Sequence, residues 1–328
     1  MKSEKPYISI LTSTWNREFF LKKMANSLLS QTLKNFEWIV GNDGSDDNTD
    51  SFIKSFSKQV KFKIKYVNSS KRIGKAAMDN ILLDHVSGEY LTWCDSDDIF
   101  LPETIEKVTR LIKEIPANKR DEYIGIYAQN VDKSGKSQTF RENNILNKTK
   151  HVSWEYIYEF IKGDGTIFER SEVLKGKKFL EVDFLISESS YFLELYKGKK
   201  FIFTPLVVKV MDRSAENSVS FGKKLSYSRG SAYCIAKIET LDRFNSYIFS
   251  KKLKIILNYW RYCIHGDIKF LKAKEMFAVT KSNWFYSLLY IFSFGICLID
   301  IILGKVEKTH IEFNKNIKSS KVKITELN

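Results

Sequence analysis

Four short apolar segments alternate with longer amphipathic segments over the first hundred residues of the chain. The apolar segments are residues 7–12, 36–41, 62–67 and 89–94, and the segments with helical character are 20–29, 46–57 and 74–85. Short runs rich in β-branched and aromatic residues indicate buried strands, and apolar side chains three and four residues apart indicate helices. This order predicts an α/β fold with a mostly parallel sheet and helices on both faces.

Acidic side chains follow two of the predicted strands. Residues 42–45 (Asn-Asp-Gly-Ser) come after the second strand, and residues 95–98 (Asp-Ser-Asp-Asp) come after the fourth. Because open α/β sheets bind ligands at the carboxyl ends of their strands, we expect both clusters at one edge of the sheet. Neighbouring carboxylates repel unless a cation compensates, and Mg²⁺ and Mn²⁺ prefer such oxygen ligands. A solvated acidic loop or a helix cap is the competing interpretation.

Four motifs in this part of the chain follow one another in order. They are ISILTSTWNR (8–17), VGNDGSDDNT (40–49), GKAAMDN (74–80) and GEYLTWCDSDD (88–98). With these motifs, residues 7–102 resemble the family 2 glycosyltransferases. The resemblance implies a Rossmann-like fold of the GT-A type. It also implies an inverting transfer of a sugar from a nucleotide-diphosphate donor, expected to be a UDP-sugar, to an acceptor hydroxyl, with Mn²⁺ or Mg²⁺ as cofactor.

The resemblance also gives roles to individual side chains. It implies that Asp43 contacts the nucleotide base, that Asp97 binds the metal ion and that Asp95 lies nearer the ribose. The residues expected to bind the nucleotide sugar are Thr14, Asn16, Asp43, Arg72, Lys75, Asp95 and Ser96. Arg72 has a competing interpretation as part of a solvated basic turn. Asn42 departs from the family, which usually has Asp there; the amide keeps hydrogen-bonding capacity but loses the charge.

Glu188 is the expected catalytic base. An inverting transfer needs a group that takes the proton of the acceptor hydroxyl, and a carboxylate suits this task. The family places this acid on a helix in the second half of the domain, and a segment with helical character follows Glu188. Ser189 stands where a second acid would be expected, so Glu188 would act alone. Asp183 is the nearest competing acid, and a non-catalytic acid at a helix N-terminus is the alternative.

The positive charge of the chain is concentrated towards its C-terminal end. Residues 1–221 hold 34 Lys and Arg against 31 Asp and Glu, and residues 222–328 hold 19 against 8. We expect residues 1–221 to form the catalytic domain and residues 222–328 to form a basic, helical region that associates with membranes. A basic surface attracts anionic lipid or nucleic acid. Because no nucleic-acid-binding motif occurs, an anionic membrane surface is the expected partner and nucleic acid is not; simple solubility is the alternative interpretation.

Residues 284–304 form a strongly apolar stretch whose one charged residue is Asp300. A helix of this length would be roughly 30 Å long, about the thickness of one hydrocarbon core. The stretch could span a membrane, lie flat on it, or pack as part of a buried helical hairpin, and its composition is compatible with all three. The last 24 residues are polar and are predicted to fray.

Cysteine usage and the N-terminal residues bear on the compartment. The four cysteines are far apart and form no C-x-x-C pair, which predicts neither a zinc site nor a disulfide framework and favours a reducing compartment. Residues 1–6 lack the apolar stretch of a signal peptide. We therefore expect the protein at the cytoplasmic face of the cell membrane. There it would use a glycan or a lipid-linked acceptor in the synthesis of a bacterial surface polysaccharide or glycolipid.

Two other functions fit parts of the sequence. A nucleotidyltransferase that makes sugar nucleotides would need a glycine-rich phosphate loop near the first strand, but residues 12–17 contain no glycine. A non-catalytic sugar- or lipid-binding scaffold on the same fold is supported by the departures at Asn42 and Ser189, and the intact acidic cluster argues against it. Sugar transfer from a nucleotide sugar is therefore the expected activity.

Overall fold

The computed structural model describes residues 6–140, 147–182, 184, 186, 188, 191–192, 195–212, 228–305 and 321–327. Packing divides the chain into two compact units. The first comprises Met1–Glu181, Leu195–Ala215 and Asn314–Asn328, and the second comprises Val182–Glu194 and Glu216–Phe313. The chain therefore leaves the first unit twice and returns to it each time.

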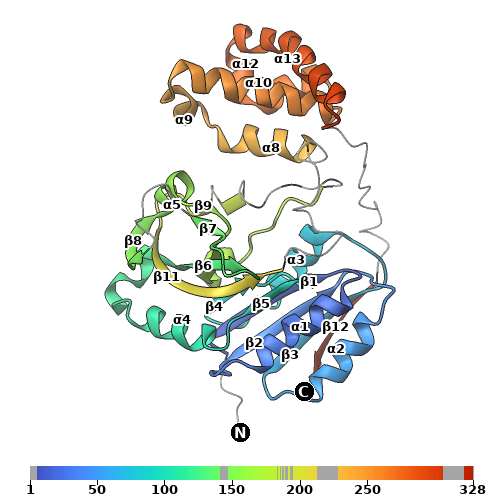
Figure 1. Cartoon of the computed structure of the whole chain (residues 1–328), viewed down its shortest axis with the longest axis vertical. Coiled ribbons are helices and arrows are strands. Elements are labelled where there is room, and N and C mark those ends of the chain that lie inside the picture. The colour runs from blue at the N-terminus through green and yellow to red at the C-terminus, as the bar shows by residue number, and fades with distance from the viewer. Residues whose placement is uncertain are drawn as a thin grey trace. The chain divides into compact units, whose positions relative to one another are not determined.

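The first unit is built on a mixed sheet whose strands adjoin in the order β12-β3-β2-β1-β4-β10-β6-β11-β5, with β8 paired to β11 (Figure 1). The strands of this sheet are β1 (Ile8–Thr14), β2 (Phe36–Asn42), β3 (Lys63–Ser69), β4 (Tyr90–Trp93), β5 (Asp98–Phe100), β6 (Tyr123–Asp132), β8 (Lys150–Ser153), β10 (Thr166–Arg170), β11 (Lys200–Met211) and β12 (Val322–Leu327). The strands β3, β2, β1 and β4 are parallel, so the four predicted strands and their predicted direction are confirmed. Antiparallel β10 then joins β4 to β6, and β7 (Thr139–Phe140) pairs separately with β9 (Lys162–Gly163).

Helices cover both faces of the parallel strands. The helices of this unit are α1 (Glu18–Leu29), α2 (Thr49–Ser57), α3 (Lys75–Asp84), α4 (Thr104–Lys113), the 3₁₀ helix η1 (Ala117–Glu122), α5 (Trp154–Phe160) and α6 (Ser171–Leu174). Side chains of a strand alternate between its two faces. On β2, Trp38 packs edge-on against Phe56 of α2, with ring centroids 5.9 Å apart, whereas Gly41 faces α3. A Cβ at Gly41 would lie 2.5 Å from Sδ of Met78, so glycine allows the close approach of α3.

The C-terminal strand β12 shows that the predicted fraying of the last 24 residues is wrong for Val322–Leu327. This strand pairs antiparallel with β3, from Val322 opposite Ser69 to Leu327 opposite Ile64. Its residues are exposed or half-buried, so backbone pairing with the edge of the sheet holds it in place more than burial does. Its partner lies about 250 residues away in the sequence, and the polar composition of the segment gives no sign of it.

The second unit is helical, as predicted. Its helices are α8 (Ser228–Ile238), α9 (Leu241–Asn245), α10 (Phe249–His265), α11 (Phe270–Met276), α12 (Ala278–Ser282) and α13 (Trp284–Ile302). The core of the unit is aromatic: Tyr259 and Trp260 of α10 are fully buried, and the Tyr259 ring packs 4.8 Å from that of Phe277. These two adjacent rings on α10 therefore help to pack it against the shorter helices of the unit.

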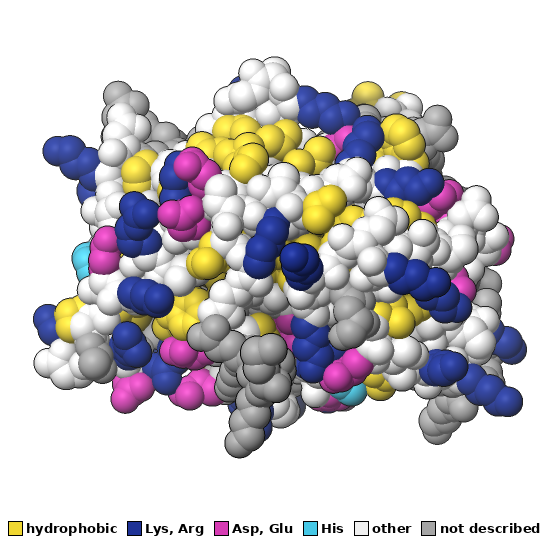
Figure 2. Space-filling view, turned by 90° about the horizontal axis from the view of Figure 1, so that it is seen from below, with side chains coloured by type: hydrophobic (Ala, Val, Ile, Leu, Met, Phe, Trp, Pro, Cys, Tyr) yellow, Lys and Arg dark blue, Asp and Glu magenta, His cyan; other side chains and the backbone are white. Residues whose placement is uncertain are grey.

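Charged side chains are intermixed on the face of the molecule drawn in Figure 2. There, Lys and Arg side chains lie among Asp and Glu side chains and small apolar areas. Among the described residues on this face, no continuous basic stripe of the kind typical of nucleic-acid-binding surfaces is present. The near balance of charge in residues 1–221 agrees with this view.

A buried acid on β10 makes the stability of the first unit depend on pH. Glu169 is fully buried and accepts a hydrogen bond from the hydroxyl of Tyr196. Burial raises the pKa of Glu169 to about 8, although the Tyr196 hydrogen bond opposes the rise. The folded state therefore holds this proton more tightly than the unfolded chain does, and stability falls as the pH rises from the unfolded pKa through about 8.

Glu169→Gln is therefore expected to stabilise the protein at alkaline pH. Glutamine accepts the same hydrogen bond without a buried charge, so the contribution of about 1.4 kcal/mol per pH unit from this proton should vanish. Urea unfolding at pH 5.5 and pH 8.5 measures the difference. Glu172→Gln, at an exposed position on α6, serves as the control and should leave the pH dependence unchanged. Parallel pH dependence in the wild type and Glu169→Gln would contradict the assignment.

Candidate active site

The parallel strands bring the predicted site residues to one edge of the sheet. β1 and β2 end in register, with Thr14 opposite Asn42, and the Asp43 amide donates to the Thr14 carbonyl at 2.9 Å. On the other side of β1, Leu11 lies opposite Trp93, the last residue of β4. The loops that follow β1, β2 and β4 therefore leave the sheet side by side, as the sequence predicts.

Asp43 is buried directly after β2 and holds the loop before α3. Its Oδ1 accepts a hydrogen bond from the amide of Ile73 at 2.6 Å, and its Oδ2 accepts one from the amide of Gly74 at 3.0 Å. Gly74 has a φ of +94°, which only glycine adopts readily. Burial raises the pKa of Asp43 to about 6, against the lowering effect of the two amides and of Arg72. Asp43 thus fixes the loop that carries Arg72.

Arg72 stacks on an aromatic ring that the sequence analysis does not single out. Its guanidinium carbon lies 3.6 Å from the centroid of the Trp15 ring, which is a cation–π contact. The contact joins the loop after β1 to the loop before α3. Arg72 is half-buried, so the solvated-turn interpretation does not describe it. The position of Trp15 inside the first motif is the one sequence signal that could have pointed to it.

Asn16 joins the loops after β1 and β2. Its amide donates to Ser45 Oγ, and its Oδ1 accepts from the amide of Asp46, each at 3.0 Å. Its φ of +51° lies in the left-handed region, which asparagine tolerates better than most residues. The nearby Asn42 accepts from the Ser45 amide through Oδ1 at 3.0 Å. Both asparagines therefore shape the loops, and the hydrogen-bonding capacity expected of Asn42 is used within the protein.

Thr14 lies at the end of β1, where its side chain is buried. Among the described residues, its Oγ1 finds no hydrogen-bond partner. A buried hydroxyl without a partner costs free energy, so an atom of a ligand is a natural partner at this edge.

The three acids of the cluster after β4 have different environments. Asp95 is 57% exposed, and its Oδ1 lies 4.0 Å from Lys75 Nζ. Asp97 Oδ2 forms an ion pair with Arg17 Nη1 at 3.0 Å. Asp98 is buried and pairs with Lys209 Nζ of β11 at 2.6 Å. Asp98 therefore belongs to the structural core, whereas Asp95 and Asp97 line the edge of the sheet.

Burial and neighbouring charges shift the pKa values of Asp97 and Asp95 in opposite directions. Burial raises the pKa of Asp97 to about 6; Asp95 and Asp98 add to the rise, and Arg17 opposes it. Desolvation also acts to raise the pKa of Asp95, but Lys75, Lys209 and Arg17 outweigh it and hold that pKa below its usual value. The edge therefore holds closely spaced negative charges, for which a divalent cation would compensate.

Of the two cationic side chains at this edge, Arg17 and Lys75, the sequence analysis predicted only Lys75 as a site residue. Arg17, the partner of Asp97, was not predicted, because the two residues are 80 positions apart. Lys75 was predicted, and its Nζ also forms an ion pair with Asp79 Oδ2 of the same helix at 2.7 Å. Ser96, also predicted, is buried within the turn between β4 and β5.

Glu188 belongs to the second compact unit. It is half-buried, and its carbonyl accepts hydrogen bonds from the amides of Tyr191 at 2.9 Å and Phe192 at 3.1 Å. It therefore begins a helical turn, as the sequence predicts. Its role as the base stays a prediction. Asp183 and Ser189 lie outside the described residues.

Related proteins point to one family. A family model described as Glycosyl transferase family 2 matches residues 9–174. The GalNAc(5)-diNAcBac-PP-undecaprenol beta-1,3-glucosyltransferase of Campylobacter jejuni is 28% identical over 197 residues, which are 60% of this chain and 62% of that protein. Glycosyltransferase GlyA of Streptococcus pneumoniae is 34% identical over 111 residues, which are 34% of this chain and 16% of that protein. The match thus spans less than two thirds of the length of either relative.

Solved structures show the same fold. Staphylococcus aureus TarS in complex with UDP-GlcNAc aligns with a TM-score of 0.55 and 17% identity over 89% of this chain and 80% of that one. The mannosyltransferase PcManGT of Pyrobaculum calidifontis, in complex with GDP-Man and Mn²⁺, aligns with a TM-score of 0.55 and 15% identity over 91% and 88%. These similarities confirm the predicted GT-A type fold. Since the family model covers just over half of the chain, the protein belongs to glycosyl transferase family 2.

Proposed function

We propose that the protein transfers a sugar from a nucleotide-diphosphate donor, a UDP-sugar in the first instance, to an acceptor hydroxyl with inversion at the anomeric carbon. The observation that carries this proposal is the edge formed after β1, β2 and β4. There, Asp95 and Asp97 lie beside the cations Lys75 and Arg17. Such a mixture of charges suits a diphosphate together with a divalent cation. Family membership supports the same reaction, because the relatives are named as glycosyltransferases.

Asp97 is the residue that would hold Mn²⁺ or Mg²⁺, with Asp95 beside it nearer the ribose. The two carboxylates suit a site for such an ion because they are hard oxygen donors and because burial, together with the charges of Asp95 and Asp98, raises the pKa of Asp97. The Mn²⁺ in the PcManGT complex supports a divalent ion on this fold. When bound, the ion would stabilise the departing diphosphate as a Lewis acid. Arg17 and Lys75 would add positive charge from the protein itself.

The loops around Thr14 would hold the nucleoside. The Thr14 hydroxyl is a candidate hydrogen-bonding group for it, since it finds no partner among the described residues. Asp43 would act at the base, with Arg72 kept in place by Trp15 and by the loop that Asp43 fixes. Asn16 and Ser96 would support these groups through the loops that they shape.

Glu188 would serve as the base. The acceptor oxygen attacks the anomeric carbon, the bond from that carbon to the diphosphate oxygen breaks, and the hydroxyl proton moves to the Glu188 carboxylate. Attack opposite the leaving group inverts the configuration. Arg17 and Lys75 would stabilise the charge that develops on the diphosphate.

We further propose a lipid-linked or glycan acceptor at the cytoplasmic face of the cell membrane, in the synthesis of a surface polysaccharide or glycolipid. Support comes from the Campylobacter relative, whose name specifies an undecaprenol-linked acceptor. The apolar helix α13 and the basic residues of the second unit support the membrane location.

Isothermal titration with a panel of nucleotide sugars, with and without Mn²⁺, tests the donor side of the proposal. We expect one UDP-sugar to bind at least tenfold more tightly with Mn²⁺ than without it. A matching assay follows the release of nucleoside diphosphate. Turnover of a nucleoside triphosphate with a sugar phosphate would instead identify a nucleotidyltransferase. Donor binding without any transfer would favour a sugar-binding scaffold.

A further inference from the structure

The polarity of α13 is inverted relative to that of an ordinary surface helix. Its exposed positions are Trp284, Phe285, Leu288, Ile291, Phe292, Phe294, Gly295, Leu298, Ile299, Ile301 and Ile302. All of them are apolar or glycine. Of its five buried residues, by contrast, Ser287, Ser293 and Asp300 are polar and Cys297 carries a thiol. A helix that faces water normally shows the opposite pattern, and an exposed apolar surface of this extent marks a contact site.

The buried face of α13 is fastened to α10 by polar contacts. Trp260 Nε1 donates to the Tyr286 carbonyl at 2.7 Å, and Ser293 Oγ donates to the Leu257 carbonyl at 3.4 Å. Asp300, 2% exposed, receives two hydrogen bonds of 2.5 Å from Arg261. Breaking these contacts would leave buried polar groups without partners. These contacts therefore hold the two helices together.

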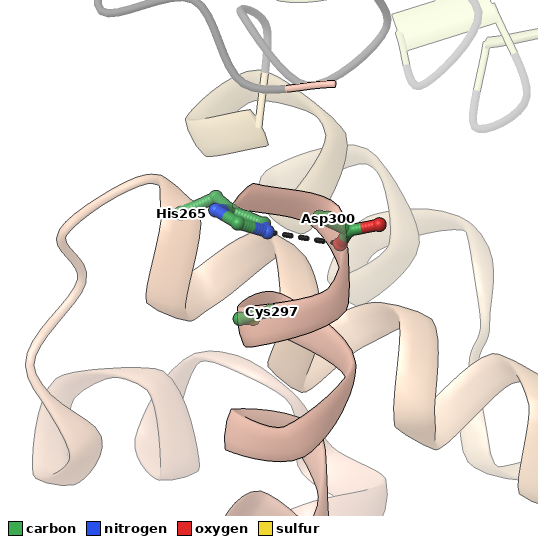
Figure 3. A group of neighbouring side chains, drawn as sticks. All are labelled: His265, Cys297 and Asp300. Carbon is green, nitrogen blue, oxygen red and sulfur yellow. Dashed lines mark hydrogen bonds and ion pairs between the residues drawn. The ribbon is translucent and has the colours of Figure 1, made fainter. Parts of the chain in front are cut away.

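The group formed by His265, Cys297 and Asp300 is not evidence for a metal site. His265 Nε2 lies 3.0 Å from Asp300 Oδ2, with Cys297 one turn of α13 before Asp300 (Figure 3). Their potential ligand atoms lie within 4.8 Å of one another. However, the Arg261 guanidinium contacts both oxygens of Asp300 and already supplies the positive charge that a metal ion would bring. The group is better explained as the clamp between α10 and α13.

The contacts between α10 and α13 restrict how α13 can be oriented in a membrane. Among the described residues, α13 is the one helix whose length and composition would let it cross a bilayer. To cross, it would have to take α10 into the hydrocarbon, together with Lys251, Lys254 and Arg261. Charged side chains at that depth cost several kcal/mol each, on the order of 3 kcal/mol even by insertion scales. A helix that lies in the interface buries its exposed face only and keeps the clamp intact.

We infer that α13 lies in the plane of an anionic membrane surface, with its exposed apolar face among the upper acyl chains and with Lys281 and Lys305 against lipid phosphates. The inference deepens the proposed membrane location and rests on it. Lys281 and Lys305 flank the two ends of α13 and are exposed. Trp284 and Phe285 at the first turn are side chains typical of the headgroup region. In this orientation, roughly 28 Å of helix contacts lipid along its length.

Charge argues for lipid rather than a second copy of the chain as the occupant of this face. In an antiparallel pair of α13 helices, Lys281 of one copy would meet Lys305 of the other. In a parallel pair, each lysine would meet its own counterpart. Both arrangements bring like charges together and disfavour the contact, whereas lipid phosphates compensate both lysines at once.

Flotation of the full-length protein with vesicles tests the contact. With vesicles of phosphatidylglycerol and phosphatidylcholine, we expect the double variant Ile291→Asp/Phe292→Asp to bind on the order of 100-fold more weakly than the wild type. Phe19→Asp on α1 is the matched control, because Phe19 is 64% exposed and Phe292 is 68% exposed. The control should float like the wild type. Failure of the wild type to float, or unchanged flotation of the double variant, would overturn the inference.

Lys281→Gln/Lys305→Gln tests the electrostatic part separately. Each lysine near an anionic surface contributes about a fivefold factor in binding, so the double variant should bind phosphatidylglycerol vesicles roughly 25-fold more weakly. Binding to vesicles of pure phosphatidylcholine should not change between the variant and the wild type. An equal loss on both kinds of vesicle would contradict a phosphate contact.

Probe depth distinguishes a flat helix from a spanning one. All four native cysteines are buried, so Leu288→Cys, Phe292→Cys and Ile299→Cys can each be labelled selectively with an environment-sensitive fluorophore. Quenching by lipids brominated at defined depths should place the three probes at one shallow depth. A deepest probe at position 292 with shallow ends would show a spanning helix, and a stable dimer with no probe in lipid would show a protein partner; either result overturns the inference. Donor binding, measured by titration on the same samples, reports on the proposed function independently.

Discussion

Asp97→Asn is expected to lower kcat by at least about 10³-fold while leaving the protein folded. Asparagine keeps the size of the side chain but removes the negative charge proposed to hold the divalent ion, and loss of one electrostatic contact to a developing charge typically costs about 10²- to 10³-fold. Loss of the ion itself adds to this. Release of nucleoside diphosphate across a Mn²⁺ titration measures the effect. Full activity in the variant, at Mn²⁺ concentrations that saturate the wild type, would refute the metal assignment.

The neighbouring Asp98 supplies a contrast for this experiment. Asp98 and Lys209 form a buried ion pair with an O–N distance of 2.6 Å. Asp98→Asn would leave Lys209 buried without its counter-charge, which destabilises a protein by about 3–5 kcal/mol. Thermal unfolding without added metal should therefore show a clear loss for Asp98→Asn and little change for Asp97→Asn. The reverse order would show that Asp97 is the structural acid of the pair.

Glu188→Gln is expected to lower kcat by roughly 10²- to 10⁴-fold, the usual contribution of a general base. Because the carboxylate is proposed to take a proton only during transfer, the affinity for the donor should stay the same. Titration calorimetry for the donor and a transfer assay on the same preparation separate these two quantities. An active variant would eliminate Glu188 as the base.

Asp183→Asn is the companion variant for Glu188→Gln. Asp183 is the nearest competing acid in the sequence, and its replacement should leave transfer within about twofold of the wild type if Glu188 is the base. Loss of transfer in Asp183→Asn together with activity in Glu188→Gln would move the role to Asp183. Loss in both variants would require the two acids to act together.

The sequence was most informative where local pattern and global topology agree. The parallel strands β1 to β4 were predictable because strands buried on both faces read as continuous apolar runs, and all seven residues of β2 are buried. The placement of Asp43 and of Asp95 followed from the same pattern. It needed no knowledge of contacts, because the ends of neighbouring parallel strands share an edge.

Contacts between residues that are far apart in the sequence were harder to predict. Arg17 contacts Asp97 across 80 positions, and Trp15 stacks under Arg72; neither pairing has a local signature. The antiparallel insertion of β10 between β4 and β6 likewise depends on tertiary pairing. The inverted polarity of α13 needed the structure too, since composition alone does not say which side of an apolar helix is covered.

The path of the chain has a practical consequence for the design of truncated fragments of this protein. The helical unit enters the sequence as an insertion, because the chain returns to the sheet to add β12 beside β3. A cut after residue 221, at the predicted domain boundary, would remove that last strand along with the helices. The edge of β3 would then present open backbone groups, a known template for aggregation. A catalytic fragment that keeps β12 would instead need a linker from residue 212 to residue 321 long enough to cross the sheet, because β11 and β12 lie near its opposite edges.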